Sequence, residues 1–243
     1  MRALILSDIH SNLEALKSVI ESAGKGSGFD QVWQFGDLVG YGPDPSECID
    51  IIRDYYAAGV AGNHDLAAIG KLSVEAFNMY ASMAALWTAE QLTQEQTKYL
   101  GSLPLKVELE DFTMVHGSPR DPVWEYVVTP GAATAGFLHL DTTRCLVGHS
   151  HIPFLCRQQG DEAVFLEFPL DTPVALGSER LIINPGGVGQ PRDGDSRASY
   201  AIYDSDEMTV YHHRAEYDIP KVQEKMQDRG LPKYLADRLT SGR

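Results

Sequence analysis

The sequence predicts an α/β protein, and two observations support this class. In the first half of the 243 residues, apolar strand-like runs alternate with segments of helical periodicity. In the second half, short strand-like runs follow one another with few helical segments between them. The length suffices for a sizeable core, and no repeat or linker divides the chain, so we expect a single domain over residues 1–243.

The first strand–helix unit lies at the start of the chain. Residues 2–6 (RALIL) form the expected strand. Residues 11–24 follow as a helix, in which Ser11 and Glu14 are spaced as a capping box. One face of this helix is apolar and is expected to pack on the sheet; it carries Leu13, Leu16, Val19 and Ile20.

The second and third units follow the same pattern. Residues 31–37 (QVWQFGD) read as a strand, and residues 44–56 read as a helix. Asp44 is placed to be the N-cap of that helix, with Pro45 at its first position. Residues 57–65 (AAGVAGNHD) contain a short third strand.

Two further helices are expected before the chain turns to strands. Residues 73–92 are apolar on more than one face, which predicts a well-buried helix. A lid or a dimer face remains an alternative for the same segment. Thr93 and Gln96 form a capping box that opens a second helix, which stops at Gly101 and Pro104.

The second half is mostly strands. The expected runs are KVELE (106–110), FTMVHG (112–117), RCLVGHS (144–150), FLCRQ (154–158), AVFLEF (163–168), RLIINPG (180–186), ASYAIYD (198–204) and MTVYHHR (208–214). Residues 118–140 are expected to be a loop insertion. The tail from Lys221 reads as two short helices, the second starting at Pro232.

Composition restricts the function. A formal charge of −14 disfavours extended contact with nucleic acid or an anionic membrane. No run of about eighteen apolar residues predicts a membrane-spanning helix. The chain begins with a strand, which leaves no room for a signal peptide, and its three cysteines show no Cys-x-x-Cys spacing. We therefore expect a cytoplasmic protein in which Cys48, Cys145 and Cys156 are reduced and buried.

Metal-capable residues stand at the ends of five apolar runs. They are Asp8 and His10, Asp37, Asn63 and His64, His116, and His149 and His151. The carboxyl ends of strands form the ligand crevice of open α/β sheets, so we expect these side chains to meet. Alternate residues of an extended chain point the same way, so Asp8 and His10 can reach one point.

Each motif alone has a plain structural interpretation as a turn, a helix cap or a solvated loop, with Asp65 as a candidate cap. Their joint occurrence favours a metal site instead. Leaving His64 aside, two carboxylates, one amide and four imidazoles without a thiolate suit divalent metals of hard or borderline character. Seven ligands suffice for two ions about 3.5–4 Å apart if one carboxylate bridges them.

The motifs resemble those of the calcineurin-like metallophosphoesterase family. They stand here as SDIHSN, GDLVGYGP, GNHD, VHGSP and GHSHIP, between residues 7 and 153. The stretches GDLVGYGPDP and NPGGVGQPRDGD are similar to those of small prokaryotic members often called phosphodiesterases. The resemblance implies a four-layer α/β/β/α sandwich.

The resemblance also implies roles for individual residues. One metal would take Asp8, His10 and His151, and the other Asn63, His116 and His149, with Asp37 bridging them. His64 would stabilise the transition state and protonate the leaving oxygen, and Asn63 would help to position the phosphate. A hydroxide bridging the metals would attack phosphorus in line. Mn²⁺ is the expected cofactor in assays, and Fe or Zn can occupy such a site.

One departure from the family bears on the substrate. Phosphoprotein phosphatases and symmetrical dinucleoside tetraphosphatases of the superfamily carry an Arg after Gly-Asp, where this chain has Gly40 and Tyr41. Loss of a bidentate phosphate ligand favours a small phosphoester, above all a phosphodiester, as substrate. The alternatives are a nucleotide or dinucleotide phosphatase and a non-catalytic scaffold of the retromer type. The sequence leaves the oligomeric state open.

Two weaker candidates lie near the motifs. Residues 184–194 (NPGGVGQPRDG) are expected to be a turn between strands; if they reach the site instead, Arg192 would contact substrate. Tyr41 is a second candidate for the pocket wall. His139, His212 and His213 are expected at exposed or half-buried positions outside the site.

Overall fold

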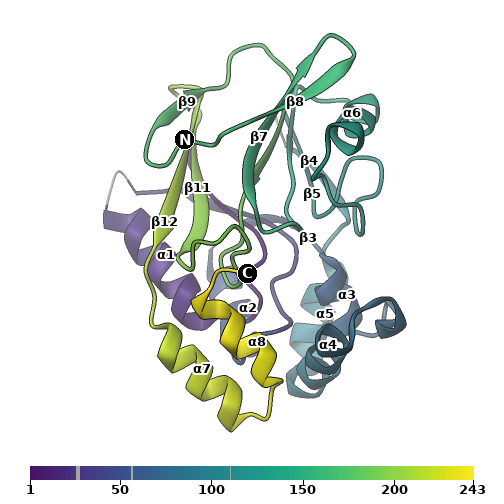
Figure 1. Ribbon diagram of the computed structural model, residues 1–243, viewed down its shortest axis with the longest axis vertical. Helices are drawn as coiled ribbons and strands as arrows, with labels where there is room; N and C mark the ends of the chain where they lie inside the picture. The colour runs from purple at the N-terminus through teal and green to yellow at the C-terminus, as the bar shows by residue number, and fades with distance from the viewer. Residues whose placement is uncertain (26–27, 56, 110) are drawn as a thin grey trace.

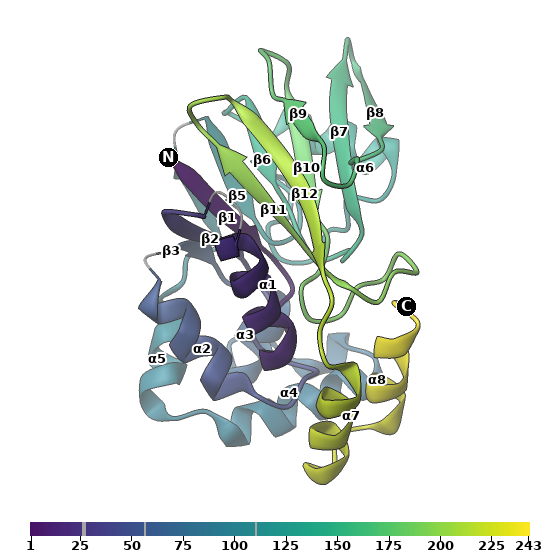
Figure 2. The same cartoon turned by 90° about the vertical axis from the view of Figure 1, so that its left-hand side faces the viewer.

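The computed structural model describes residues 1–25, 28–55, 57–109 and 111–243. Two six-stranded sheets pack against each other, and helices cover their outer faces (Figures 1 and 2). This arrangement confirms the predicted α/β class and its four layers. Tyr56 and Glu110, which end two predicted segments, lie outside the described residues. A single domain over the whole chain stays a prediction.

The first sheet has the strand order β3-β2-β1-β11-β12-β9. Strands β1, β2 and β3 are parallel, and β11 runs antiparallel to β1. Parallel strands place their carboxyl ends at one edge of the sheet, and the first three motifs follow these strands. The strands are β1 Arg2–Leu6, β2 Gln31–Phe35, β3 Ala57–Val60, β9 Pro173–Ala175, β11 Ala198–Asp204 and β12 Thr209–Ala215.

The second sheet has the order β4-β5-β6-β10-β7-β8. Its inner strands β5, β6 and β10 are parallel, so the two remaining motifs, after β5 and β6, also share one edge. The strands are β4 Lys106–Leu109, β5 Phe112–Val115, β6 Arg144–Leu146, β7 Pro153–Gln159, β8 Glu162–Leu166 and β10 Leu181–Pro185. Each predicted strand is present, and β9, which has only three residues, is additional.

Successive side chains of a strand point to opposite faces of its sheet, so each inner strand can pack against a different layer on either side. Ala3 and Ile5 of β1 face the second sheet and pack in the core that contains Trp33. Leu4 and Leu6 face the other way, into the core beneath the helices. The helices are α1 Leu13–Lys25, α2 Pro45–Asp54, α3 Asn63–Ala68, α4 Met79–Gln91, α5 Gln94–Ser102, α6 Pro130–Leu138, α7 Ile219–Asp228 and α8 Lys233–Asp237, with 3-10 turns at Val74–Ala76 and Arg238–Thr240.

The start of α1 differs from the prediction. Asn12, rather than Ser11, caps the helix, because its Oδ1 accepts a hydrogen bond from the Ala15 N–H over 3.1 Å. Ser11 has a positive φ of 53° and belongs to the loop that carries Asp8 and His10. Glu14 instead forms an ion pair with Lys225 of α7, at 2.7 Å. The predicted capping box is therefore wrong, although the helix itself is present.

Two segments of the middle of the chain also correct the prediction. Helix α4 is not fully buried, because only one of its faces packs inward. That face carries Ala81, Ala84, Ala85 and Thr88. Met79, Met83 and Leu86 are 64%, 50% and 55% exposed. Residues 118–140 are not all loop. They contain α6, whose Thr129 cap accepts from the Ala132 N–H and whose Pro130 takes the first turn.

The C-terminal helices α7 and α8 pack against each other, and α7 also contacts α1 (Figures 1 and 2). The buried carboxylate of Asp44 receives Lys225 at 2.8 Å and Arg229 at 3.1 Å. Asp44 precedes α2 without capping it by its side chain, and thus serves as an anchor for α7. The two predicted tail helices are confirmed.

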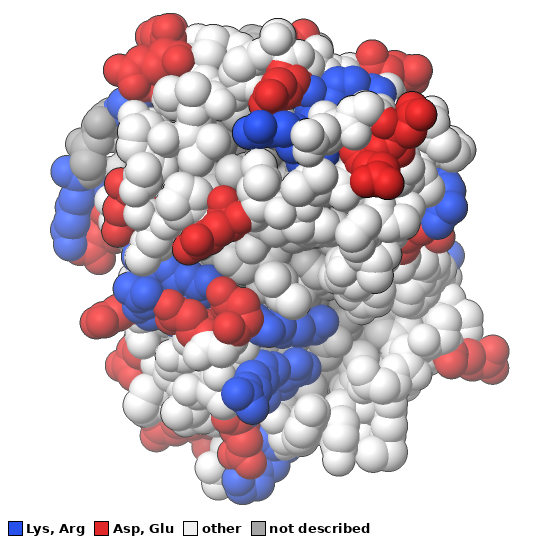
Figure 3. Space-filling view, turned by 45° about the horizontal axis from the view of Figure 1, so that its top comes forward, with Lys and Arg blue, Asp and Glu red and all other residues white. Residues whose placement is uncertain are grey.

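Other expectations about the chain can be compared with the structure directly. All three cysteines are free and buried, as predicted. In the described ranges, no helix is both long and apolar enough to cross a membrane. Blue and red side chains are interspersed over the face shown in Figure 3, without a continuous basic surface there. His212 is only 4% exposed, so its predicted exposure was wrong; it lies on β12, contacts the Ser199 hydroxyl of β11 and stacks on the ring of Phe168.

Candidate metal centre

The strand ends of both sheets meet and bring the motif residues together. Every one of these side chains is buried, with exposed fractions of 0–3%. The candidate ligands are Asp8 and His10 after β1, Asp37 after β2, Asn63 at the start of α3, His116 after β5, and His149 and His151 after β6. The sequence expectation that these residues share one place is therefore met in the fold.

One group of ligand atoms forms around Asp8. The Nε2 atoms of His10 and His151 lie 3.2 Å apart, and His151 Nε2 lies 3.2 Å from Asp8 Oδ1. His10 Nε2 is 3.9 Å from the same oxygen. Three side chains from two strands of different sheets thus direct donor atoms at one small volume.

A second group forms around His116. Its Nε2 lies 3.0 Å from Asn63 Oδ1, 3.0 Å from His149 Nδ1 and 3.3 Å from Asp37 Oδ2. The same Asp37 oxygen is 3.6 Å from Nε2 of His10, which belongs to the first group. Asp37 therefore lies between the two groups, where one carboxylate can serve both.

His64 lies close to these groups as well. Together with His10 and Asp37 it offers ligand atoms within 4.8 Å of one another, so proximity alone does not separate it from the ligands. Its backbone N–H donates to Asp37 Oδ1 over 2.9 Å. Among the described residues, its buried Nδ1 has no hydrogen-bond partner.

Backbone carbonyls orient the imidazoles. Nδ1 of His10 faces the Val39 carbonyl at 3.2 Å, and Nδ1 of His116 faces that of Phe35 at 3.0 Å. Nδ1 of His151 faces the Gln190 carbonyl at 2.6 Å. If each Nδ1 carries the proton, each Nε2 presents its lone pair to the centre, as a metal ligand must.

Burial and mutual charge shift the pKa values of the site. Burial raises the pKa of Asp8 to about 7 and lowers that of His149 to about 2. Burial would also raise the pKa of Asp37, but the neighbouring imidazoles of His116 and His64 hold it well below its usual range. Burial alone would lower the pKa of His116, which Asp37 raises to about 9. Asp37 and His116 thus favour each other's charged forms.

The backbone of the site is strained. Of the described residues other than glycine, nine have positive φ, and five of them are candidate ligands: Asp8, His10, Asp37, His149 and His151. Such conformations cost about 1–3 kcal/mol each and cluster at functional sites, where the surrounding structure maintains them. Tyr41, with φ of 58°, has the same conformation.

Two glycines permit the close approach of the loops. A Cβ at Gly62 would lie 2.1 Å from Oδ1 of Asp37, and a Cβ at Gly40 would lie 2.5 Å from Nδ1 of His64. Gly40 also has a φ of 92°. Asp65 fixes the same region, because its carboxylate accepts from the N–H groups of Gly62 and Val39 at 2.9 and 3.0 Å. The buried Asp65 side chain thus links the loop after β2 to the loop after β3.

A cavity of about 270 Å³ opens beside the candidate ligands. Its lining includes Asp37, Asn63, His64, His149 and His151, together with Tyr41, Phe77, Trp124, Tyr126 and Arg192. Asp8, His10 and His116 are buried next to it. Both weaker sequence candidates, Tyr41 and Arg192, therefore lie at the cavity.

Residues 184–194 connect β10 to β11, as predicted, but they also reach the site, which was the less favoured alternative. The Gly189 N–H donates to the Asp8 carbonyl over 2.9 Å, and the Gln190 carbonyl faces His151. These contacts carry Arg192 to the cavity. Phe77, Trp124, Tyr126 and Gln190 also lie at the site, although no spacing in the chain connects them to the motifs.

Comparison with known proteins agrees with the fold and the motifs. Residues 1–208 match the family model of the calcineurin-like phosphoesterase superfamily domain. The chain therefore belongs to the calcineurin-like phosphoesterase superfamily, whose members are metal-dependent hydrolases. The buried carboxylates and imidazoles described above are the metal-capable groups of this member.

Particular relatives cover the chain to different extents. A protein of Methanocaldococcus jannaschii is 40% identical over 245 residues, which include 98% of this chain and 97% of that one. The crystal structure of a metallophosphoesterase from Sphaerobacter thermophilus has a TM-score of 0.91 at 44% identity, covering 100% of this chain and 99% of that chain. A symmetrical bis(5'-nucleosyl)-tetraphosphatase of Vibrio campbellii is 28% identical over 128 residues, 51% of this chain and 47% of that protein.

Proposed function

We propose that the protein hydrolyses a small phosphoester, preferentially a phosphodiester, with two divalent metal ions. The observation that carries this proposal is the position of Asp37, whose Oδ2 lies 3.6 Å from His10 and 3.3 Å from His116. One shared carboxylate between two groups of nitrogen and oxygen donors suits a pair of ions. The donor set contains no thiolate, which fits catalytic rather than structural metal binding.

The residues that would hold the ions follow from the two groups. Asp8, His10 and His151 would bind one, Asn63, His116 and His149 the other, and Asp37 both. When bound, the ions would activate a water molecule as the nucleophile and offset the charge of the phosphate oxygens. Mn²⁺ is our first choice for assays, and Fe or Zn fits the same ligands.

His64 would protonate the leaving oxygen. Its imidazole lines the cavity, and its Nδ1 has no partner within the part of the chain that the structure describes. The hydrogen bond from its backbone to Asp37 fixes it beside the shared carboxylate. A positioned imidazole of this kind contributes about 10²–10⁴-fold to the rate of proton transfer. Asn63 would orient the phosphate from the same turn.

Arg192 would bind a phosphate oxygen. Its guanidinium donates to Gln190 Oε1 at 3.0 Å, and its buried Nε has no hydrogen-bond partner among the described residues. Tyr41 supports it, because the guanidinium carbon lies 5.8 Å from the centre of the Tyr41 ring. Arg192 would thus supply the cation that is missing from the segment after Asp37.

A nucleotide or dinucleotide phosphatase is the second candidate. The observation that favours it is the similarity to the tetraphosphatase of Vibrio campbellii, although that match covers only 51% of this chain. A non-catalytic scaffold is less well supported, because all seven candidate ligands and His64 are present and buried. We further propose that the protein acts in the cytoplasm on small substrates.

The first experiment is an assay with chelator-treated protein. Bis-para-nitrophenyl phosphate, para-nitrophenyl phosphate and a panel of nucleotides are supplied with and without Mn²⁺, Fe²⁺ or Zn²⁺. Turnover of the diester that returns only with metal supports the proposal, and faster turnover of nucleotides supports the second candidate. Metal bound at about two ions per chain without any turnover would leave the scaffold as the better explanation.

A further inference from the structure

A row of aromatic side chains lines one side of the cavity. Phe77 precedes α4, and Trp124 and Tyr126 lie between β5 and α6. The ring of Phe77 lies 4.9 Å from that of His64 and 5.3 Å from that of Trp124. Trp124 lies 6.4 Å from the ring of His149. The aromatic row therefore begins beside His64 and continues to the candidate metal ligands.

Tyr126 occupies a special place in this row. Its ring stacks on the imidazole of His149, with centroids 3.8 Å apart and planes 18° from parallel. The side chain is nevertheless 45% exposed, so part of its surface remains available to a ligand. Arg192 lines the same cavity. Aromatic surface and positive charge are thus adjacent at the cavity.

The loop that carries Trp124 and Tyr126 is held by its own hydrogen bonds. The Gly117 N–H donates to the Pro122 carbonyl over 2.7 Å, and the Ser118 N–H donates to the Asp121 carbonyl over 2.9 Å. Oδ1 of Asp121 in turn accepts from the Trp124 N–H at 3.1 Å. A loop fixed in this way presents its rings without a large ordering cost on binding.

A nucleoside phosphoester combines the two chemical properties that the cavity offers. Its base provides a flat π-surface for stacking, and its phosphate provides anionic oxygens. We propose that the cavity takes a nucleoside phosphoester, whose base lies against Trp124 and Tyr126 while a phosphate oxygen contacts Arg192. This inference rests on the proposed function, because the scissile phosphate must lie at the candidate metal ligands.

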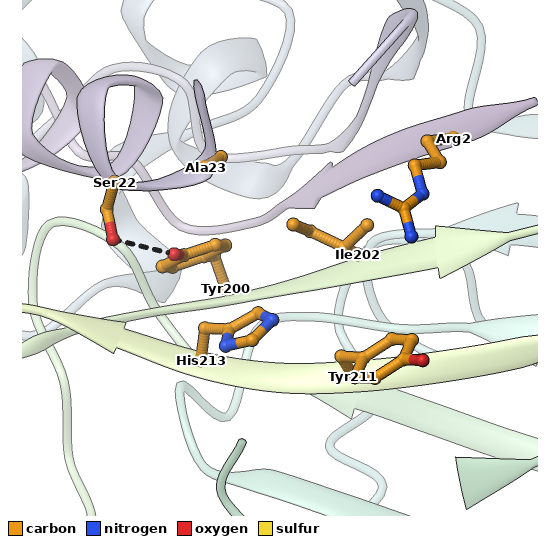
Figure 4. A pocket seen from close by; sticks show the side chains of 7 residues that line it. All are labelled: Arg2, Ser22, Ala23, Tyr200, Ile202, Tyr211 and His213. Atoms are coloured by element: carbon orange, nitrogen blue, oxygen red, sulfur yellow. Dashed lines mark hydrogen bonds between the residues drawn. The ribbon is translucent and has the colours of Figure 1, made fainter. Parts of the chain in front are cut away.

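A second cavity is also lined by aromatic side chains but, in the part of the chain that the structure describes, has no metal-capable group beside it. It also has a volume of about 270 Å³ and contains Tyr200, Tyr211 and His213 (Figure 4). Its Arg2 is already paired with Asp204 at 2.7 Å, and the Tyr200 hydroxyl donates to Ser22. The three metal-capable groups found among the described residues all lie elsewhere. Tyr211 therefore provides a matched control.

The test compares two esters with the same leaving group. The para-nitrophenyl ester of thymidine 5'-monophosphate and methyl para-nitrophenyl phosphate both release para-nitrophenol, but only the first carries a base on its other arm. Stacking of one base corresponds to about a five- to 150-fold effect. We expect Mn²⁺-loaded wild-type protein to prefer the nucleoside ester in kcat/KM by at least about fivefold.

Variants locate the preference. Trp124→Ala and Tyr126→Ala should lower the ratio of the two kcat/KM values toward one, whereas Tyr126→Phe, which keeps the ring, should retain most of it. Tyr211→Ala should keep the wild-type ratio. Equal kcat/KM values in the wild type, or a ratio that neither alanine variant changes, would overturn the inference while leaving phosphoester hydrolysis intact.

Failure of the chemistry is a separate outcome. Metal-loaded protein that hydrolyses neither ester would contradict the proposed function. Calorimetric titration with thymidine 5'-monophosphate then decides the inference. Binding that weakens by about fivefold or more in Trp124→Ala and not in Tyr211→Ala supports it, and equal or absent binding in all proteins refutes it. Metal content and circular dichroism verify that each variant is folded.

Discussion

The backbone N–H of His64 donates a hydrogen bond to Oδ1 of Asp37 over 2.9 Å. The other oxygen of Asp37 faces His10 at 3.6 Å and His116 at 3.3 Å. One carboxylate thus holds the proposed acid in place and lies between both groups of candidate ligands. Its two oxygens therefore make different contacts.

Replacing Asp37 by Ala should release both metal ions together. The variant removes the only carboxylate proposed to be shared, so metal content should fall from about two ions per chain to less than one, with loss of turnover by more than about 100-fold. Elemental analysis after desalting measures the content. Asp206→Ala, at a side chain that is 84% exposed, is the control. Retention of two ions would contradict the shared role.

Replacing His64 by Ala should leave the metal content intact and slow the chemistry. A lost proton donor predicts a decrease in kcat of about 10²–10⁴-fold, greatest for esters with poor leaving groups. Para-nitrophenyl and alkyl esters are compared under saturation. If the variant loses an ion instead, His64 is a ligand, which its distance from His10 and Asp37 also permits.

Replacing Arg192 should weaken the binding of anionic substrate. A charged hydrogen bond to phosphate contributes about 1.5–3 kcal/mol, so Arg192→Ala should decrease kcat/KM by about 10- to 150-fold. Arg192→Lys keeps the positive charge but lacks the planar guanidinium with its paired donors, and should recover part of the lost kcat/KM. The metal content should stay the same. A normal KM in Arg192→Ala would show that the guanidinium does not reach the substrate.

Replacing Asp44 by Ala should destabilise the packing of α7. The variant leaves Lys225 and Arg229 without the carboxylate that receives them at 2.8 and 3.1 Å. Both cations are partly exposed, at 24% and 37%, so we expect a loss of about 1–3 kcal/mol rather than the larger cost of a fully buried pair. Urea unfolding measures it, with Asp206→Ala as the control.

His212 should make folding sensitive to acid. Burial, aided by Arg214, lowers its pKa to about 4 from 6.5. Below pH 6.5 the unfolded chain takes up a proton that the folded protein does not bind until near pH 4, so the free energy of unfolding falls as the pH decreases through this range. His212→Gln should reduce the decrease in the free energy of unfolding between pH 7 and pH 5 by about 2 kcal/mol. An unchanged pH dependence of stability in His212→Gln would contradict this role.

The candidate ligands could be found from the sequence because each stands directly after a strand. Strand ends are local features, and parallel pairing then brings Asp8, Asp37 and Asn63 to one edge without further information. The opposing sheet is placed by its own alternating apolar residues. For this reason the meeting of these side chains was predictable from the chain itself, whereas the four layers and the division into two groups of donors were expected from the family resemblance.

Other parts of the site depend on contacts that cannot be deduced from the spacing of apolar residues in the sequence. Phe77 and Trp124 meet although they come from unrelated segments, and Arg192 reaches the cavity only because the Gly189 N–H binds the Asp8 carbonyl. The exposed apolar face of α4 has a similar origin, since the sequence shows its apolar residues but not which face a neighbour covers. Tertiary packing decides such features.

The pairing of β1 with β11 has a consequence for folding during translation. Ile5 pairs with Ala201, so β1, which leads into Asp8, cannot form its pairing with β11 until that much later strand has been synthesised. Such non-local pairing slows folding and leaves strand edges open in the meantime. During translation, the loop bearing Asp8 therefore lacks its contact with Gly189 until the last third of the polypeptide has left the ribosome.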